Sequence, residues 1–223
     1  MRLSNYLIIL LLLSCAFQKS EAHPIATDRA ERWQLDLSTG DLRFYRDLET
    51  GVGYWLLVYE VENSTGEDRR WVPQFDLVTD KGEIISEGDN VSRAVQLHVL
   101  DIFGDPLMKT QSDASGPILQ GEENAIRSIA IWKANNEDVR QVQVFASGAS
   151  GDTAEVEHPI TGEKKKLHRV VQLSWTVDGG VDQLILKPLP VRPVSSGTSV
   201  RDLTASSKGL ISGTNVSRKW IFR

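Results

Sequence analysis

Histidine and cysteine would be the usual building blocks of a metal or catalytic site, and this chain has four histidines and one cysteine. His23, His98, His158 and His168 are scattered, with no i,i+4 pair and no H-E-x-x-H motif. A zinc site needs three or four converging ligands, and here only unrelated segments would supply them. We therefore predict no metal site.

The serine and carboxylate patterns also lack a catalytic signature. The segment closest to a G-x-S-x-G nucleophile motif, Gly148-Ala149-Ser150-Gly151, is one residue short and lies between two predicted strands. No acidic run matches the D-x-[DN]-x-[DN]-G calcium loop. A glycosidase acid pair is defined by the separation of its carboxyl groups in space, which sequence spacing does not reveal. The sequence predicts no catalytic residue and no cofactor, and thus not an enzyme.

Tryptophan is the other residue type with a recognisable binding chemistry, since exposed indoles form platforms for sugars and peptides. Four of the six tryptophans fall on the apolar faces of predicted strands and are expected in the core: Trp33, Trp55, Trp71 and Trp175. The other two are predicted to be exposed. Our predicted partner contacts are Trp132, Arg218, Lys219 and Trp220.

The N-terminus has the features of an export signal. Arg2 precedes a short apolar run, and small and polar residues follow up to Ala22. The run is too short to span a bilayer. We predict a signal peptide over residues 1–22 and a mature chain that begins at His23. The alternative is a lipid anchor at Cys15, because Leu12-Leu13-Ser14-Cys15 resembles a bacterial lipobox, although Leu13 departs from that pattern.

Charge is unevenly distributed. The whole chain has a formal net charge of −5, yet residues 189–223 contain six basic side chains and one acidic one. Several prolines and a Ser/Gly cluster mark the start of this segment. We therefore divide the chain into a signal peptide (1–22), a folded domain (23–188) and a basic, flexible C-terminal tail (189–223). A net-acidic, exported protein is not expected to bind nucleic acid, and the sequence does not indicate an oligomeric state.

Short strands separated by turns dominate the body. In residues 54–62, Trp55, Leu57, Tyr59 and Val61 share one face, which is typical of a strand. We interpret residues 54–83 as a β-meander and residues 33–37 and 42–45 as two strands joined by a turn. Pro73 predicts that the following strand lies at an edge or begins its pairing late. Eight or nine such strands favour an antiparallel sandwich.

Residues 89–103 are ambiguous between strand and helix. Val91, Val95 and Val99 fit one face of a helix, with Asp89 or Asn90 as N-cap. Gly104 provides a stop signal. A short helix is our preferred interpretation, and it is the only one predicted in the body.

A resemblance supports the predicted architecture. The residues Val61, Asn63, Gly66, Phe75, Leu77 and Gly82, and the later run "ILQGEENAIRSIAIW", are similar to a pattern of uncharacterised secreted bacterial proteins with an extracellular immunoglobulin-like fold. The resemblance covers about residues 30–186 and implies export and a sandwich fold. It carries over no catalytic residue.

Together these features predict an exported, periplasmic or extracellular, non-catalytic module that binds or scaffolds another component of the cell envelope. The alternatives are an architectural domain without a specific ligand, and an enzyme or accessory module that acts on polysaccharide. Three segments also have the form of N-glycosylation acceptors, beginning at Asn63, Asn90 and Asn215.

Overall fold

The structure, a computed structural model, describes residues 24–158, 160–177 and 217–223. In this part of the chain the protein is mainly β, as predicted, with two α-helices and several sheets, none of them closed into a barrel. The strands are β1 (Asp36–Arg46), β2 (Gly53–Glu62), β3 (Arg69–Trp71), β4 (Gln74–Thr79), β5 (Ile84–Ser86), β6 (Lys109–Thr110), β7 (Gly116–Ile118), β8 (Ile126–Lys133), β9 (Gln141–Ser147), β10 (Thr153–Glu157), β11 (Lys164–Thr176) and β12 (Ser217–Phe222). The helices are α2 (Arg93–Phe103) and the one-turn α3 (Gln111–Ala114), with a 3₁₀ turn, η2, at Glu122–Asn124.

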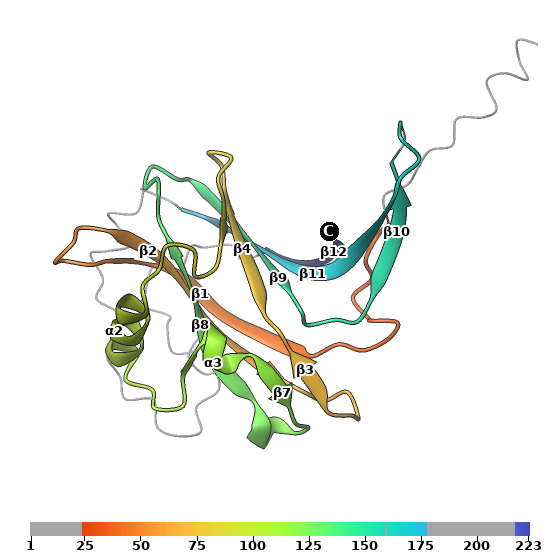
Figure 1. Cartoon of the computed structure of the whole chain (residues 1–223), viewed down its shortest axis with the longest axis horizontal. Coiled ribbons are helices and arrows are strands. Elements are labelled where there is room, and N and C mark those ends of the chain that lie inside the picture. The colour runs from red at the N-terminus through yellow and green to blue at the C-terminus, as the bar shows by residue number, and fades with distance from the viewer. Residues whose placement is uncertain (1–23, 159, 178–216) are drawn as a thin grey trace, which may run out of the picture.

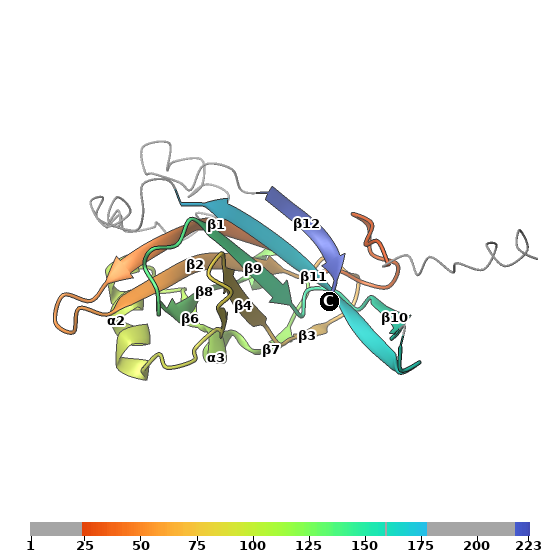
Figure 2. The ribbon, with the colours of Figure 1, turned by 90° about the horizontal axis from the view of Figure 1, so that it is seen from above.

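Two sheets form the body (Figures 1 and 2). One has the order β1-β2-β8-β6, and the other runs β5-β4-β9-β11, with β10 and β12 also paired to β11. All pairs are antiparallel except β6 with β8, which are parallel over two residues. Short β3 and β7 form a separate two-stranded sheet.

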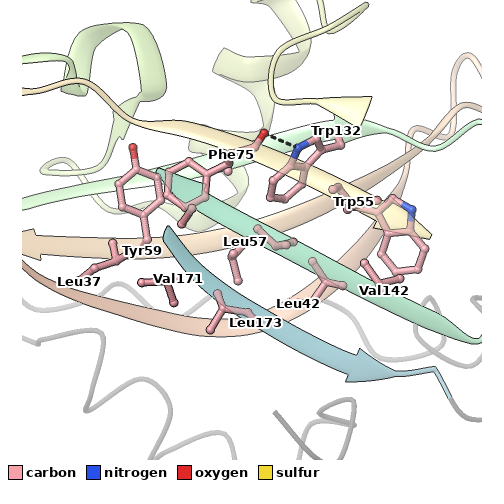
Figure 3. Packing of buried hydrophobic residues seen from close by; sticks show 14 of the residues in the cluster. Leu37, Leu42, Trp55, Leu57, Tyr59, Phe75, Trp132, Val142, Val171 and Leu173 are labelled. Carbon is pink, nitrogen blue, oxygen red and sulfur yellow. Dashed lines mark hydrogen bonds between the residues drawn. The ribbon is translucent and has the colours of Figure 1, made fainter. Parts of the chain in front are cut away.

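The core lies between the two larger sheets. Trp55, Leu57, Tyr59 and Val61 point into it from β2, which confirms the predicted face of that strand. Val142, Val171 and Leu173 meet them from the opposite sheet (Figure 3). Val144 belongs to the same cluster. The predicted core positions of Trp55, Trp71 and Trp175 are confirmed, and Trp33 is partly buried against the same cluster.

Helix α2 covers the outer face of the four-stranded sheet (Figure 1). Its Val99 is fully buried against Leu56 and Val58 of β2 and Ile129 and Ile131 of β8. Because these strands are covered on both sides, their sequences read as nearly continuous apolar runs. The described residues contain no helix that is long and apolar enough to cross a membrane.

The predicted helix at residues 89–103 is confirmed, but its start was misplaced. Ser92 is the N-cap, and its side chain accepts a hydrogen bond from the Val95 backbone. Gly104 ends the helix in the left-handed conformation, as expected. α3 is a second helix that the sequence analysis did not predict.

The predicted β-meander over residues 54–83 is wrong. β2 and β4 belong to different sheets, and the chain between them crosses from one sheet to the other. Asn63 fixes this crossing, because its buried side-chain amide donates to the carbonyls of Glu67 and Ile118, both at 2.9 Å. Pairing of β4 does begin late, after Pro73, although β4 is not an edge strand since it pairs with both β5 and β9.

The two strands predicted around Ser38-Thr39-Gly40-Asp41 are one strand, β1. A shift in register between Thr39 and Leu42 marks a bulge, and pairing with β2 continues on both sides of it. The turn-forming residues of this segment therefore bend the strand instead of reversing it.

Candidate functional site

The edge of the larger sheet at β11 is the best candidate for a site, because the end of the chain docks there. Strand β12 pairs with β11 in antiparallel register from Arg169↔Phe222 to Ser174↔Ser217. His168 exchanges both backbone hydrogen bonds with Arg223, at 2.8 and 2.9 Å, whereas the Arg169 amide donates to the Asp152 carbonyl. The backbone groups of successive residues thus point to opposite sides of β11. β12 therefore lies along one side of β11, and β9 and β10 lie along the other (Figure 2).

Arg169 is the central charged group of this region and is only 1% exposed. Its guanidinium donates to the Gln34 side chain at 2.8 Å and to the Thr27 carbonyl at 2.6 Å. Its central carbon lies 4.0 Å from the centroid of the Trp220 ring, a cation–π contact. Its Nε has no hydrogen-bond partner among the described residues. We call Arg169 with Thr27, Gln34, Asp152 and Trp220 the Arg169 cluster.

Asp152 joins the N-terminal segment to this cluster. Its nearly buried carboxylate accepts the backbone amides of Glu31 and Arg32 at 2.9 and 2.8 Å, and it lies 3.8 Å from the Arg169 guanidinium. Burial lowers the pKa of Arg169, while Asp152 and Asp28 act in the opposite direction. The cluster is therefore held by three segments of the chain that are far apart in sequence.

Arg223 continues the contact onto the outer face of the same sheet. It lies 3.5 Å from the Asp76 carboxylate of β4 and 4.3 Å from the centroid of the Phe145 ring of β9. The terminal strand is thus fixed by main-chain pairing and by side-chain contacts on both faces of the sheet. Such an arrangement can recognise an extended basic and aromatic segment by register and by side chain.

The predicted partner contacts divide into two groups. Trp132 is fully buried, and its indole donates to the Phe75 carbonyl at 3.2 Å (Figure 3), so the expectation that it is exposed is wrong. β8 is covered on both faces, and alternation could not show which way Trp132 points. Arg218, Lys219 and Trp220 all lie on β12, the first two exposed and Trp220 half-buried.

Two further predictions concern the termini. The described end of the predicted tail is a strand in the sheet rather than an extension, and residues 189–216 lie outside the described residues, as does Cys15. Of the glycosylation-like segments, Asn63 is unavailable in the fold because it is buried and its amide is hydrogen-bonded. Asn90 is exposed, and Asn215 is not among the described residues.

A second buried arginine lies on the other sheet. Arg127 of β8 donates to Asp105 at 2.7 Å and to Glu60 of β2 at 2.9 Å, and Asp105 is nearly inaccessible. Burial alone would lower the pKa of Arg127, but the hydrogen bonds to Asp105 and Glu60 outweigh it and raise the pKa. We call these three residues the Arg127 cluster. Its donors and acceptors are used within the fold.

Among the described residues, Glu87, between β5 and α2, has the carboxyl whose pKa is raised most. Burial raises the pKa of Glu87 to about 7, with Asp89 adding to the shift and a hydrogen bond from the Ile131 backbone opposing it. Burial also raises the pKa of the nearby Tyr59 hydroxyl, which lies close to Ser128 and Trp71 without forming a hydrogen bond of normal geometry. The structure shows no nucleophile hydrogen-bonded to Glu87 within the described residues.

In the described part of the chain no group of three or more histidine, cysteine, aspartate or glutamate side chains is arranged to hold a metal ion. The segment Gly148-Ala149-Ser150-Gly151 is a loop between β9 and β10, as predicted. Gly151 is needed there, because a Cβ atom would lie 2.2 Å from the Trp33 indole nitrogen.

Arg169 and Arg127 were not predicted as site residues, although Arg169 left a signal in the sequence. Leu167, Val171, Leu173 and Trp175 define the inward face of β11, and the missing apolar residue in that row is Arg169. A charged residue at a core position of a strand is almost never buried without partners.

Comparisons of the chain with protein-family models, with curated proteins and with solved structures found no match.

Proposed function

We propose that this protein is an exported, non-catalytic module of the cell envelope that binds or scaffolds another component through the β11–β12 edge. The observation that carries the proposal is the docking of the basic, aromatic strand β12 onto the sheet. It places two exposed cations, Arg218 and Lys219, on the two faces of one strand at the edge of a net-acidic protein. Anionic envelope polymers and acidic protein surfaces are partners of suitable charge.

The proposed architecture is an immunoglobulin-like sandwich. Such domains place strands A, B, E and D in one sheet and C′, C, F and G in the other. The orders β1-β2-β8-β6 and β5-β4-β9-β11 correspond to these if the strands are matched in chain sequence. The parallel pairing of β6 with β8 is a departure, since strands D and E are antiparallel. This fold supports binding through edges and loops without implying a particular chemistry.

Export through a signal peptide at residues 1–22 remains part of the proposal, with lipidation at Cys15 as the alternative route to the envelope. Mass spectrometry of the N-terminal peptide from the native protein distinguishes the two. A free His23 supports cleavage after Ala22, and a lipidated Cys15 supports the anchor.

Crosslinking in intact cells tests the binding proposal. We expect the full chain to capture a discrete partner that a Lys219→Glu variant captures poorly, because the exposed cation at the edge has been reversed. Lys165→Glu is the matched control, since it makes the same change at an exposed position on the part of β11 that pairs with β10. Equal capture by all three chains would contradict a role for β12. Capture of no partner by any chain would favour an architectural domain without a specific ligand.

A further inference from the structure

The connection between β11 and β12 is much longer than their geometry needs. Ser174 near the end of β11 lies opposite Ser217 at the start of β12, so the two ends to be joined are neighbours. Adjacent antiparallel strands are usually joined by two to five residues. Here 39 residues, 178–216, separate the described parts of the chain. A chain of that length reaches at most about 130 Å when extended. Connectivity therefore does not require β12 to dock on its own copy.

The edge that receives β12 depends on this strand for backbone and side-chain contacts. Without β12, the backbone groups of His168 lose their partners, since both bond to Arg223. The buried guanidinium of Arg169 loses the Trp220 ring that covers it at 4.0 Å. An uncovered edge of this kind is a template for another strand.

Charge favours the approach of β12 from a second molecule as well. Three of the last six residues are basic, Arg218, Lys219 and Arg223, and Arg223 meets Asp76 on the body. The rest of the chain has an excess of acidic side chains, so the basic strand is attracted to the body of either copy, while two full chains, both net acidic, repel each other at long range.

We propose that the β11 edge is a strand-acceptor site and that two copies of this chain exchange their β12 strands across it. In the exchanged dimer each acceptor edge receives the register Arg169↔Phe222 to Ser174↔Ser217 from its partner. The inference goes beyond the proposed envelope partner and does not depend on it. Effective concentration is in the millimolar range for a short tether and falls as the tether lengthens, so a connection of 39 residues gives about a millimolar or less. The exchanged form is therefore minor in dilute solution and grows when copies are held close together.

Cysteine crosslinking between two full chains tests the exchange. Gln172 and Lys219 are directly opposed in the register, and opposed residues on paired strands lie within disulfide reach. One chain carries Gln172→Cys and the other Lys219→Cys, both with Cys15→Ser. At about 1 mM we expect about tenfold more disulfide-linked dimer than from the control pair Lys164→Cys with Lys219→Cys. Lys164 lies on the same strand but pairs with β10.

Two additional chains make each outcome decisive. The double variant Gln172→Cys/Lys219→Cys in one chain should form an intramolecular disulfide at low concentration, which shows that the geometry permits the bond. Adding Trp220→Ala to the Lys219→Cys chain should reduce the dimer yield, because docking rather than collision brings the cysteines together. An intramolecular bond without a dimer above the control would overturn the exchange. Failure of the intramolecular bond would overturn the strand-acceptor site itself. Since only purified protein is used, failure to find an envelope partner in cells leaves this result unaffected.

Discussion

Arg127 and Arg169 are both buried on a face of a sheet, but different kinds of groups surround them. Arg127 is hydrogen-bonded to two carboxylates, Asp105 and Glu60, at 2.7 and 2.9 Å. Arg169 has its only ion-pair carboxylate, among the described residues, at 3.8 Å and relies on neutral acceptors and an aromatic ring. The pKa of Arg127 is raised by its hydrogen bonds in spite of burial, and the pKa of Arg169 is lowered by burial.

The difference reflects how each cluster is assembled from the chain. The Arg127 cluster is built from neighbouring strands and the turn after α2, and it cannot be taken apart without disturbing the sheet. The Arg169 cluster is completed by the N-terminal segment, the β9–β10 loop and the last strand. We expect such segments to open locally more readily than central strands of a sheet. Damage to the first should therefore lower global stability, and damage to the second should open a local region.

The largest expected effect is that of Asp105→Ala. The substitution removes the Asp105 carboxylate from the buried guanidinium of Arg127, and it removes the acceptor of the Leu107 amide. We expect the free energy of unfolding in urea to fall by about 3 kcal/mol, because an incompletely compensated buried charge is costly. Asp138→Ala is the control, since Asp138 pairs with Lys81 at an exposed position and should leave stability unchanged. Similar losses in both variants would remove the distinction between buried and exposed pairs.

Asp152→Ala should have the next largest effect and should act locally. Two backbone amides, of Glu31 and Arg32, lose their acceptor. We expect a loss of about 2 kcal/mol together with faster hydrogen exchange at these two amides. Asp152→Asn keeps one carbonyl acceptor and should fall between the wild type and the alanine variant. Unchanged exchange at Glu31 and Arg32 would show that the N-terminal segment is not held by Asp152.

Trp220→Ala tests the detachable part of the comparison. The ring is half-buried and covers Arg169, so its loss should cost about 1 kcal/mol. The expected signature is faster hydrogen exchange at His168 and Arg223, which bond to each other, with little change in β2 and β8. Trp220→Phe retains an aromatic ring and should restore most of the protection. Equal acceleration throughout both sheets would show that β12 is part of the global folding unit.

The sequence predicted local structure better than it predicted strand partners. Alternation placed Trp55, Leu57, Tyr59 and Val61 on the core face, because a half-exposed strand end reveals the period of two. Alternation carries no information on which sheet a strand joins. The supposed meander at residues 54–83 failed for that reason, since the crossing depends on the distant contact of Asn63 with Ile118.

The site was only partly predictable, for two physical reasons. Arg218, Lys219 and Trp220 were recognisable as a basic and aromatic group, but their pairing with β11 depends on contacts between residues almost 50 positions apart. Trp132 was misplaced because β8 is apolar on both faces. The gap in the apolar row at Arg169 was visible, although its partners Thr27 and Gln34 were not predictable from spacing.

The smallest expected effect is that of pH on stability through Glu87. The pH can be varied over the range in which Glu87 titrates while both arginines stay protonated. Its pKa is raised by burial from 4.5 to about 7 in the folded state. Between these values the folded state binds more protons than the unfolded state, so this group's contribution to stability is present below about pH 4.5 and is lost as the pH rises through 7. The full shift would correspond to about 3 kcal/mol, and solvent screening of the partly exposed carboxyl reduces the difference that we expect to about 1 kcal/mol.

Glu87→Gln is the variant that isolates this contribution, because the amide keeps the shape of the side chain without the charge. It should be more stable than the wild type at pH 8 and should lose that advantage toward pH 5, as measured by urea unfolding at each pH. Comparing the two proteins at each pH cancels every effect of pH that they share. Parallel stability curves across this range would mean that Glu87 titrates normally. The expected difference, confined to high pH, would connect the charge of Glu87 to the stability of the segment that leads into α2.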